Sequence, residues 1–360
     1  MQPAIAVDQA DAKAGPAEVD GDGERRFGVL HEAPLASSYN TGMRHTSDPP
    51  LIVLTGPTAI GKSALALHLA DRFGAEILSA DSRQVYRYLD VGTAKPTAAE
   101  RARVPHHLLD LADPDTPFSV ADYQAAADLA LEDIARRGRV ALLVGGSPHY
   151  VQAVVDRLEL PRVAPRPELR AALEALAARE GPLAVWERLR ALDPAAAEAV
   201  DRYNVRRLIR AIEVVTVSGE PLAAANRRRG PERPALHLAL TAPRPELYAR
   251  IDARIDAMLA AGWLSEVKAL LARGYAPSLP SLSATGYREL VQVVRGELSL
   301  ADAIRLIQHR THAFARRQYT WLRRDPRLEW YAQAPDLEAL VGERVESYLA
   351  SSEGVRSWTS

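Results

Sequence analysis

The sequence predicts an α/β fold in which a mostly parallel sheet carries an all-helical insertion and a helical C-terminal part. Three observations support this prediction. An apolar segment at 51–55 runs directly into a glycine-rich loop, short apolar runs then alternate with helical stretches, and between about 165 and 200 only helical periodicity remains. Alternating strands and helices are typical of parallel sheets with helices on both faces.

The glycine-rich loop has the spacing G-x-x-x-x-G-K-[ST] of a phosphate-binding loop. Its residues are Gly56, Pro57, Thr58, Ala59, Ile60, Gly61, Lys62 and Ser63. The glycines let the backbone wrap around an anion, and the following helix adds its positive end. Lys62 supplies a charge and Ser63 a hydroxyl for Mg²⁺. The loop therefore predicts a P-loop NTPase-like core that binds a phosphate chain, with Mg²⁺ as cofactor.

The remaining elements follow in order along the chain. Strands are predicted at 51–55, 76–79, 140–144 and 236–240, and helices at 64–73, 246–261, 264–273, 287–295 and 300–321, with a further helix ending at 218–219. Leucine and valine recur at helical spacing from 169 to 192 with no strand between them, after three prolines at 161–167. We therefore predict a disordered tail at 1–48, a P-loop core at 49–160 and 201–340, a helical insertion at 161–200 and a C-terminal tail at 341–360.

Composition limits the cell compartment and the partners. The chain has no cysteine, which removes disulfides and zinc–thiolate sites and fits a reducing cytoplasm. No apolar run reaches the roughly 18 residues of a membrane span, and no secretory pattern opens the chain. The net charge of −1 conceals an acidic N-terminal segment and arginine clusters further on, and such clusters suit RNA. We expect a cytoplasmic monomer with no membrane contact.

The residue that completes the site is less clear from position alone. P-loop enzymes usually place a carboxylate on a second apolar strand, but the strand at 140–144 runs into Gly145-Gly146-Ser147. The strand at 76–79 instead delivers Asp81 to the edge where ligands bind in open sheets. Asp81 is either a general base or a cap of the next turn, and position does not decide between them.

Several motifs in order now resemble a known family. They are the loop at 56–63, Asp81-Ser82 with Gln84-Val85-Tyr86, and the segments Gly92–Pro96, Pro105–Leu108, Phe118–Tyr123, Val144–Gly146 and Gly286–Arg288. Together these motifs resemble the bacterial tRNA dimethylallyltransferases, also called tRNA isopentenyltransferases, over roughly residues 50–331. The family transfers a dimethylallyl group from dimethylallyl pyrophosphate to N6 of adenosine 37, beside the tRNA anticodon.

The resemblance implies a role for each group of residues. The P-loop holds pyrophosphate as a leaving group, Asp81 is the base, and Ser147 and Arg254 complete the catalytic set, with Arg250 a weaker candidate for the role of Arg254. Contacts with the tRNA anticodon stem-loop are implied at Asp81, Ser82, Arg83, Gln84, Ser147, Arg170, Arg206, Arg207, Leu208, Ile209, Arg210, Ser283, Gly286, Tyr287, Arg288, Arg316, Arg317, Gln318, Trp321 and Arg323. The helical insertion is expected to contact the anticodon arm.

Some alternatives stay open at this stage. Arg254 could instead be an exposed helix residue that pairs with Asp252 or Asp256. Trp321 is equally suited to stacking on RNA and to core packing. Ser147-Pro148-His149 departs from the usual Gly-Gly-Thr-x-Leu-Tyr pattern, and we assign His149 no catalytic role. A P-loop small-molecule kinase is the alternative enzyme, and a tRNA-binding protein with a vestigial loop is the non-enzymatic one.

Overall fold

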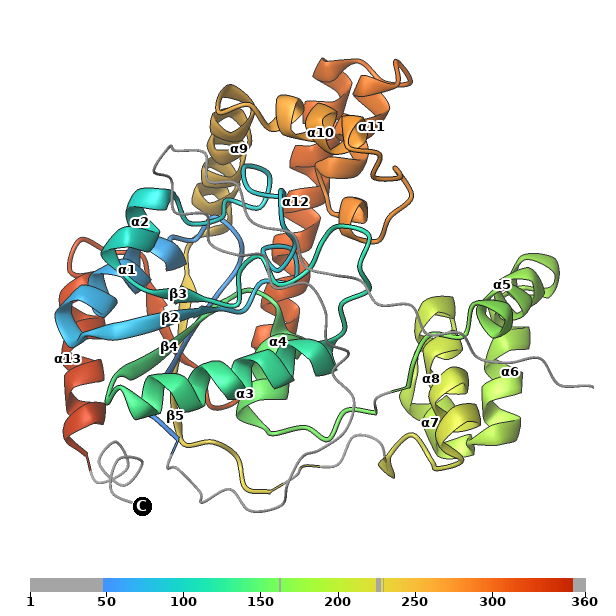
Figure 1. Ribbon diagram of the computed structural model, residues 1–360, viewed down its shortest axis with the longest axis horizontal. Coiled ribbons are helices and arrows are strands. Elements are labelled where there is room, and N and C mark those ends of the chain that lie inside the picture. Colours follow the sequence, from blue (N-terminus) through green and yellow to red (C-terminus); the bar gives the residue numbers. More distant parts are fainter. Residues whose placement is uncertain (1–47, 162, 225–227, 229, 352–360) are drawn as a thin grey trace, which may run out of the picture. The chain divides into compact units, whose positions relative to one another are not determined.

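A computed structural model describes residues 48–161, 163–224, 228 and 230–351 (Figure 1). Its centre is one six-stranded sheet in the order β3-β2-β4-β1-β5-β6, with every pair parallel. The strands are β1 (Leu51–Thr55), β2 (Ala75–Ser79), β3 (His106–His107), β4 (Val140–Gly145), β5 (Ala235–Thr241) and β6 (Glu329–Ala332). The four predicted strands are therefore confirmed, and the two edge strands are additions.

The inner strands are apolar throughout because both faces of the sheet are covered. Every residue of β1, β2 and β4 is buried, so alternation of polar and apolar residues is absent there. Figure 1 shows helices on either side of the sheet. The helices that flank the strands are α1 (Lys62–Phe73), α2 (Ala98–Arg103), α3 (Val120–Arg136) and α4 (Pro148–Val155).

Strand register brings three loops to one edge of the sheet. Thr55, the last residue of β1, lies beside Gly145 at the end of β4. Ser79, the last residue of β2, lies beside Val144. The P-loop, the segment that carries Asp81 and the segment that carries Ser147 therefore leave the sheet at neighbouring points.

The helical insertion has a hydrophobic core of its own. It contains α5 (Pro167–Glu180), α6 (Pro182–Leu192), α7 (Pro194–Ala199) and α8 (Val205–Ser218). Leu208 and Ile212 of α8 are buried together with Leu173, Val185 and Leu189. The predicted boundary at residue 200 is therefore wrong for α8, because the apolar face of this helix packs within the insertion. The predicted helix end is confirmed by Gly219, whose φ of 70° closes α8.

The C-terminal part is helical, as predicted, with one short strand. Its helices are α9 (Arg244–Ala260), α10 (Trp263–Ala272), the short helix Ser281–Ser283, α11 (Tyr287–Val294), α12 (Leu300–Leu322) and α13 (Leu337–Ala350). Most of α13 falls in the segment predicted as a tail, and this part of the prediction is wrong because Val341 and Val345 are fully buried. Residues 352–360 lie outside the described residues.

The predicted tail at 1–48 lies outside the described residues up to residue 47. Asp48 is described, and its carboxylate pairs with Arg157 and with Arg233. No helix in the described part of the chain combines the length and the apolarity that a membrane span needs.

Candidate active site at the carboxyl ends of the strands

The P-loop connects β1 to α1 through backbone that favours glycine. Gly56 has a φ of 146° and Gly61 a φ of 104°. A Cβ on Gly56 would lie 2.9 Å from the Leu240 carbonyl oxygen, so the loop passes against β5 with no room for a side chain. Ser63 is exposed in the first turn of α1. The predicted motif therefore has the strand, turn and helix that a phosphate-binding loop needs.

Two glutamines hold the P-loop in place. The Gln318 amide accepts a hydrogen bond from the Thr58 N–H (2.9 Å) and donates one to the Gly146 carbonyl (2.9 Å). Gln333 donates to the Ile60 carbonyl (2.7 Å). Gln318 was predicted to contact tRNA, and the structure corrects this: its buried side chain joins α12 to the loops after β1 and β4.

Three charged side chains from three elements converge beside the loop. Lys62 Nζ donates to the carbonyls of Gly56 (3.0 Å) and Pro57 (2.8 Å). Burial and, to a smaller extent, the nearby Arg254 lower the pKa of Lys62 to about 7, against an opposing effect of Asp81. Burial also lowers the pKa of Arg254, with Asp81 again opposing. The site therefore holds two cations and one carboxylate within electrostatic range of each other.

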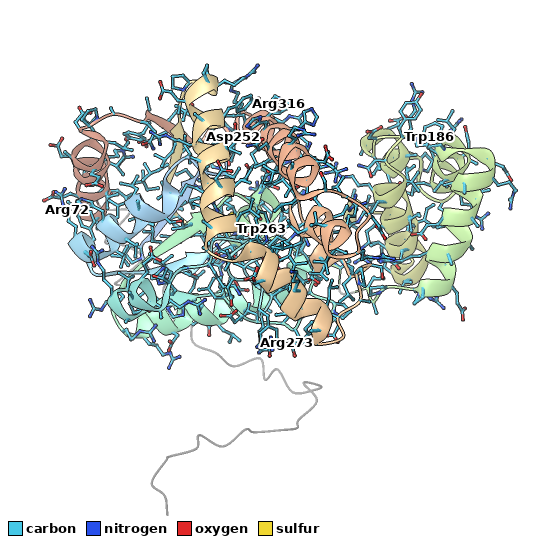
Figure 2. All side chains as sticks on the ribbon, turned by 90° about the horizontal axis from the view of Figure 1, so that it is seen from above. Arg72, Trp186, Asp252, Trp263, Arg273 and Arg316 are labelled. Carbon is cyan, nitrogen blue, oxygen red and sulfur yellow. The ribbon has the colours of Figure 1, made fainter. Side chains whose placement is uncertain are left out.

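Arg254 projects from α9 without an ion pair. In the described part of the chain, no carboxylate lies within ion-pair distance of Arg254, and Asp252 instead contacts His312 Nε2 (2.9 Å). Figure 2 shows Asp252 on α9 and Arg316 on α12, the helices that pack together here. Pairing of Arg254 with Asp252 or Asp256 is therefore contradicted, and its charge faces Lys62 and Asp81.

Asp81 forms the local turn that its position allowed, and its carboxylate remains a candidate general base. Its Oδ1 accepts a hydrogen bond from the Arg83 N–H (2.8 Å), which is a local turn. The neighbouring Ser82 N–H donates to Ser147 Oγ (3.1 Å), so the segments after β2 and β4 are joined directly. The turn fixes the backbone, and the half-buried carboxylate keeps acceptor capacity for a ligand proton.

The segment after Asp81 is held by a network that the sequence did not suggest. Gln84 accepts from Ser79 Oγ (2.8 Å) and donates to the carbonyls of Thr93 and Ala94 (both 3.1 Å). The Lys95 ammonium is buried and donates to Asp110 Oδ1 (2.6 Å). The half-buried Gln84 side chain therefore positions this segment, and its implied tRNA contact stays a prediction.

Glu266 of α10, which is far away in the sequence, binds the backbone of residues 90–92 in this segment. Its carboxylate accepts hydrogen bonds from the N–H groups of Asp90 (2.8 Å), Val91 (2.6 Å) and Gly92 (3.2 Å), and from Tyr287 OH (2.6 Å). Sequence analysis missed Glu266, because a lone acid on a helix carries no local signal of partners 175 residues away.

Trp263 packs against the same segment, at Gly92, and against Gly286. Its indole fills the space where a Cβ on Gly92 or Gly286 would lie, at 1.9 and 2.0 Å. Figure 2 places Trp263 where α9 passes into α10. Tyr287 and Gly286 were expected to contact tRNA, and the structure corrects both: they are buried, and Tyr287 contacts Trp263 edge-on with ring centroids 5.7 Å apart.

The other implied tRNA contacts divide by exposure. Seven of them are exposed, namely Arg206, Arg207, Ser283, Arg288, Arg316, Arg317 and Arg323. Leu208 and Ile209 are buried in the core of the insertion, so their side chains cannot contact RNA, and this implication is wrong. Arg83 donates to the Pro280 carbonyl (2.7 Å), and Trp321 is half-buried.

Arg170 and Arg210 have a carboxylate partner. The fully buried Glu213 accepts from Arg170 Nη2 (2.8 Å), from Arg210 Nη1 (2.6 Å) and from the Arg166 N–H (2.6 Å). Burial opposes ionisation of Glu213, but these hydrogen bonds lower its pKa to about 2. Arg170, which was expected to bind RNA, therefore also holds α5 against α8, whereas Arg210 pairs with Glu213 within α8.

Comparison with known proteins identifies what this arrangement is similar to. Residues 84–325 match the family model described as IPP transferase, and residues 49–111 match the one described as isopentenyl transferase. A tRNA dimethylallyltransferase of Roseiflexus sp. (strain RS-1) is 51% identical over 301 residues, covering 83% of this chain and 99% of the relative. One of Thermomicrobium roseum is 46% identical, covering 85% and 94%.

Solved structures agree with these relatives. The full-length tRNA isopentenylpyrophosphate transferase of Bacillus halodurans superposes with a TM-score of 0.63 at 34% identity, covering 85% of this chain and 99% of that one. A eukaryotic dimethylallyltransferase acting on tRNA superposes with a TM-score of 0.70 at 26% identity, covering 86% and 80%.

Proposed function

The chain belongs to the IPP transferase family, and we propose that it transfers a dimethylallyl group from dimethylallyl pyrophosphate to N6 of adenosine 37 in the anticodon stem-loop of tRNA. The products are N6-dimethylallyladenosine and pyrophosphate. The observation that carries the proposal is the convergence of Lys62, Arg254 and Asp81 at the P-loop. This set contains cations for a leaving pyrophosphate and one carboxylate for a proton.

The reaction assigns one task to each side chain. Adenine N6 attacks C1 of the dimethylallyl group, the C1–O bond breaks, and the electron pair leaves on pyrophosphate. Asp81 accepts the proton that N6 loses as the C–N bond forms. Lys62 and Arg254 stabilise the charge that develops on the leaving oxygen. The lone pair of N6 is delocalised into the ring, so N6 is a weak nucleophile that needs a base. Because the adenine lies within the anticodon stack, it is flipped out first.

Mg²⁺ fits this site as a cofactor that shares its ligands with the substrate. Ser63 carries an exposed hydroxyl at the P-loop. In the described segments, no group of three or more histidine or acidic side chains forms a metal cage. Mg²⁺ commonly takes most of its ligands from phosphate oxygens and water, so Ser63 would be its protein ligand. When bound, the ion neutralises charge on the pyrophosphate.

The kinase alternative lacks the residues it needs. A P-loop kinase usually holds Mg²⁺ with a carboxylate after a second apolar strand. Here β4 ends in Gly145 and continues into Gly146 and Ser147, and Gly145 leaves no room for a side chain because its Cβ would lie 2.1 Å from the Ala80 oxygen. The family relationship also favours transfer to tRNA over phosphoryl transfer.

The test is the transfer itself. The protein is incubated with Mg²⁺, dimethylallyl pyrophosphate and an unmodified anticodon stem-loop with adenosine at position 37. The RNA is then digested, and the masses of the nucleosides are measured by mass spectrometry. We expect a dimethylallyl mass on adenosine that disappears when guanosine replaces it. If no nucleoside gains mass and the protein instead transfers phosphate from ATP to a small-molecule acceptor, the kinase alternative would be favoured. A monomer working in the cytoplasm remains a prediction, and gel filtration with light scattering tests its oligomeric part.

A further inference from the structure

His149 and Trp321 form an aromatic pair next to the site that the proposed reaction does not use. His149 is the second residue of α4, two positions after Ser147, and its side chain is exposed. Its ring meets Trp321 of α12 edge-on, with ring centroids 5.6 Å apart and planes at 70°. Trp321 lies one helical turn after Gln318, which holds the P-loop. Both rings are therefore carried by elements that are fixed to the site.

His149 does not serve to fill the hydrophobic core. A residue that fills a core is buried, whereas His149 is exposed and Trp321 is only half-buried. The described contacts of the His149 side chain are this ring contact and the charge of Arg207. The aromatic surface therefore has a free side.

Two arginines of the insertion act electrostatically on this part of the core. Desolvation lowers the pKa of His149, and the nearby Arg207 guanidinium lowers it further. Burial likewise lowers the pKa of Arg83, and Arg206 acts on Arg83 in the same direction. In the described part of the chain, Arg206 and Arg207 have no ion-pair partner, and both are exposed.

Aromatic faces beside unpaired arginines suit one class of ligand in particular. Unpaired bases of RNA loops stack on aromatic side chains while arginines contact the backbone. The lowered pKa keeps the His149 ring neutral near pH 7, so it offers a π-surface without adding charge. When the target adenosine leaves the anticodon stack, its neighbour loses a stacking partner, and an aromatic side chain of the protein can take that place.

We infer that His149 and Trp321 form a stacking subsite for the nucleobase adjacent to the adenosine that is alkylated. This inference rests on the proposed function and adds a specificity element to it. The subsite recognises an unpaired base by its flat face rather than by its hydrogen-bonding edge, so removal of that base should remove the contact.

A double comparison of protein and RNA variants tests the inference. His149→Leu keeps the apolar bulk and removes the ring, His149→Phe keeps a ring, and His309→Leu removes an exposed histidine elsewhere on α12. Each protein is assayed with the intact stem-loop and with stem-loops that carry an abasic nucleotide on one side of position 37. The KM for the stem-loop, kcat and the KM for dimethylallyl pyrophosphate are measured.

We expect His149→Leu to raise the KM for the intact stem-loop about tenfold, the scale of one lost base–aromatic contact. His149→Phe and His309→Leu should stay close to the parent protein, with kcat and the KM for dimethylallyl pyrophosphate unchanged throughout. One abasic stem-loop should abolish the difference between His149→Leu and the parent. If His149→Leu raises KM by the same factor on the intact and on both abasic stem-loops, the subsite is overturned. Absence of transfer by the parent protein on the intact stem-loop would instead reject the proposed function.

Discussion

Glu266 in the core and Glu213 in the insertion do similar structural work by different chemistry. Glu266 gathers three backbone N–H groups and one phenol, so it holds the loop behind Asp81 with neutral donors. Glu213 gathers two arginine side chains and one N–H, so it holds α5 against α8 largely through charge. In the core, the hydrogen bonds of Glu266 therefore do not involve the charged side chains proposed to react, namely Lys62, Arg254 and Asp81. The insertion instead uses for its structure some of the arginines expected to meet RNA.

For the core, we predict that a substitution at the site can lower the transfer rate without weakening stem-loop binding. Asp81→Asn keeps the shape of the side chain and an oxygen for the Arg83 N–H, but it cannot accept a proton from N6. We expect transfer at saturating substrates to fall by about 10²-fold or more, the range for a lost acid–base group. Single-turnover transfer and stem-loop affinity should be measured together. Near-normal transfer would remove Asp81 from the base role.

The insertion half predicts sensitivity to acid. Because hydrogen bonds from arginine lower the pKa of buried Glu213 to about 2 from 4.5, its ionised form stabilises the folded insertion. This contribution is complete above pH 4.5 and is lost as the pH falls towards 2. Linkage gives a loss of about 2 kcal/mol between pH 6 and pH 3 from this group. Protection factors in α5 and α8, that is exchange rates corrected for the intrinsic pH dependence of amide exchange, should fall over this range.

A matched variant isolates the Glu213 contribution to acid sensitivity. Glu213→Gln removes the titrating group, so the protection factors in α5 and α8 should already be low at pH 6 and should change little on going to pH 3. If the variant and the parent protein lose protection in parallel, another group causes the acid sensitivity.

Glu266 offers a direct contrast, because replacing it should affect rate rather than domain stability. In Glu266→Gln, one oxygen becomes an NH₂ group that faces N–H donors, so part of the loop at 90–92 loses its acceptor. The carbonyls of Thr93 and Ala94, which directly follow this loop, accept from Gln84. We therefore expect kcat to fall about tenfold, the scale of one lost hydrogen bond, with stem-loop affinity kept. Glu297→Gln, in an exposed ion pair with Arg295, is the control and should change neither quantity. Equal losses of kcat in both variants would contradict a positioning role for Glu266.

Local patterns allowed some of these features to be predicted and not others. The P-loop follows from its own spacing, and β1, β2 and β4 follow from continuous apolar runs. Strand β3 has two residues, and β6 alternates partly buried with exposed residues at the sheet edge, so neither shows such a run. The roles of Glu266 and Gln318 depend on partners far away in sequence, which no local pattern encodes.

Tyr287, Arg170 and Arg210 show the same limit at the level of single side chains. An aromatic residue beside an arginine suits RNA stacking, but Tyr287 is buried and its hydroxyl donates to Glu266. Arginines at 170, 206, 207 and 210 are identical as sequence, and only the position of Glu213 separates the paired from the unpaired ones.

That separation leads to the smallest expected effect. Arg206→Ala with Arg207→Ala removes two exposed cations without an ion-pair partner among the described residues, so the insertion should stay folded while tRNA binding weakens several-fold. The salt dependence of log K should decrease by up to about 1.4, the value for two contacts with single-stranded phosphates. Arg179→Ala with Arg190→Ala, both in exposed pairs with neighbouring acids, is the control and should leave the slope unchanged. Arg170→Ala with Arg210→Ala should instead leave Glu213 buried without partners and increase hydrogen exchange in α5 and α8. If the 206/207 pair changed exchange and not the salt slope, the division between free and structurally occupied arginines would be wrong, because charge in the insertion would then serve folding alone.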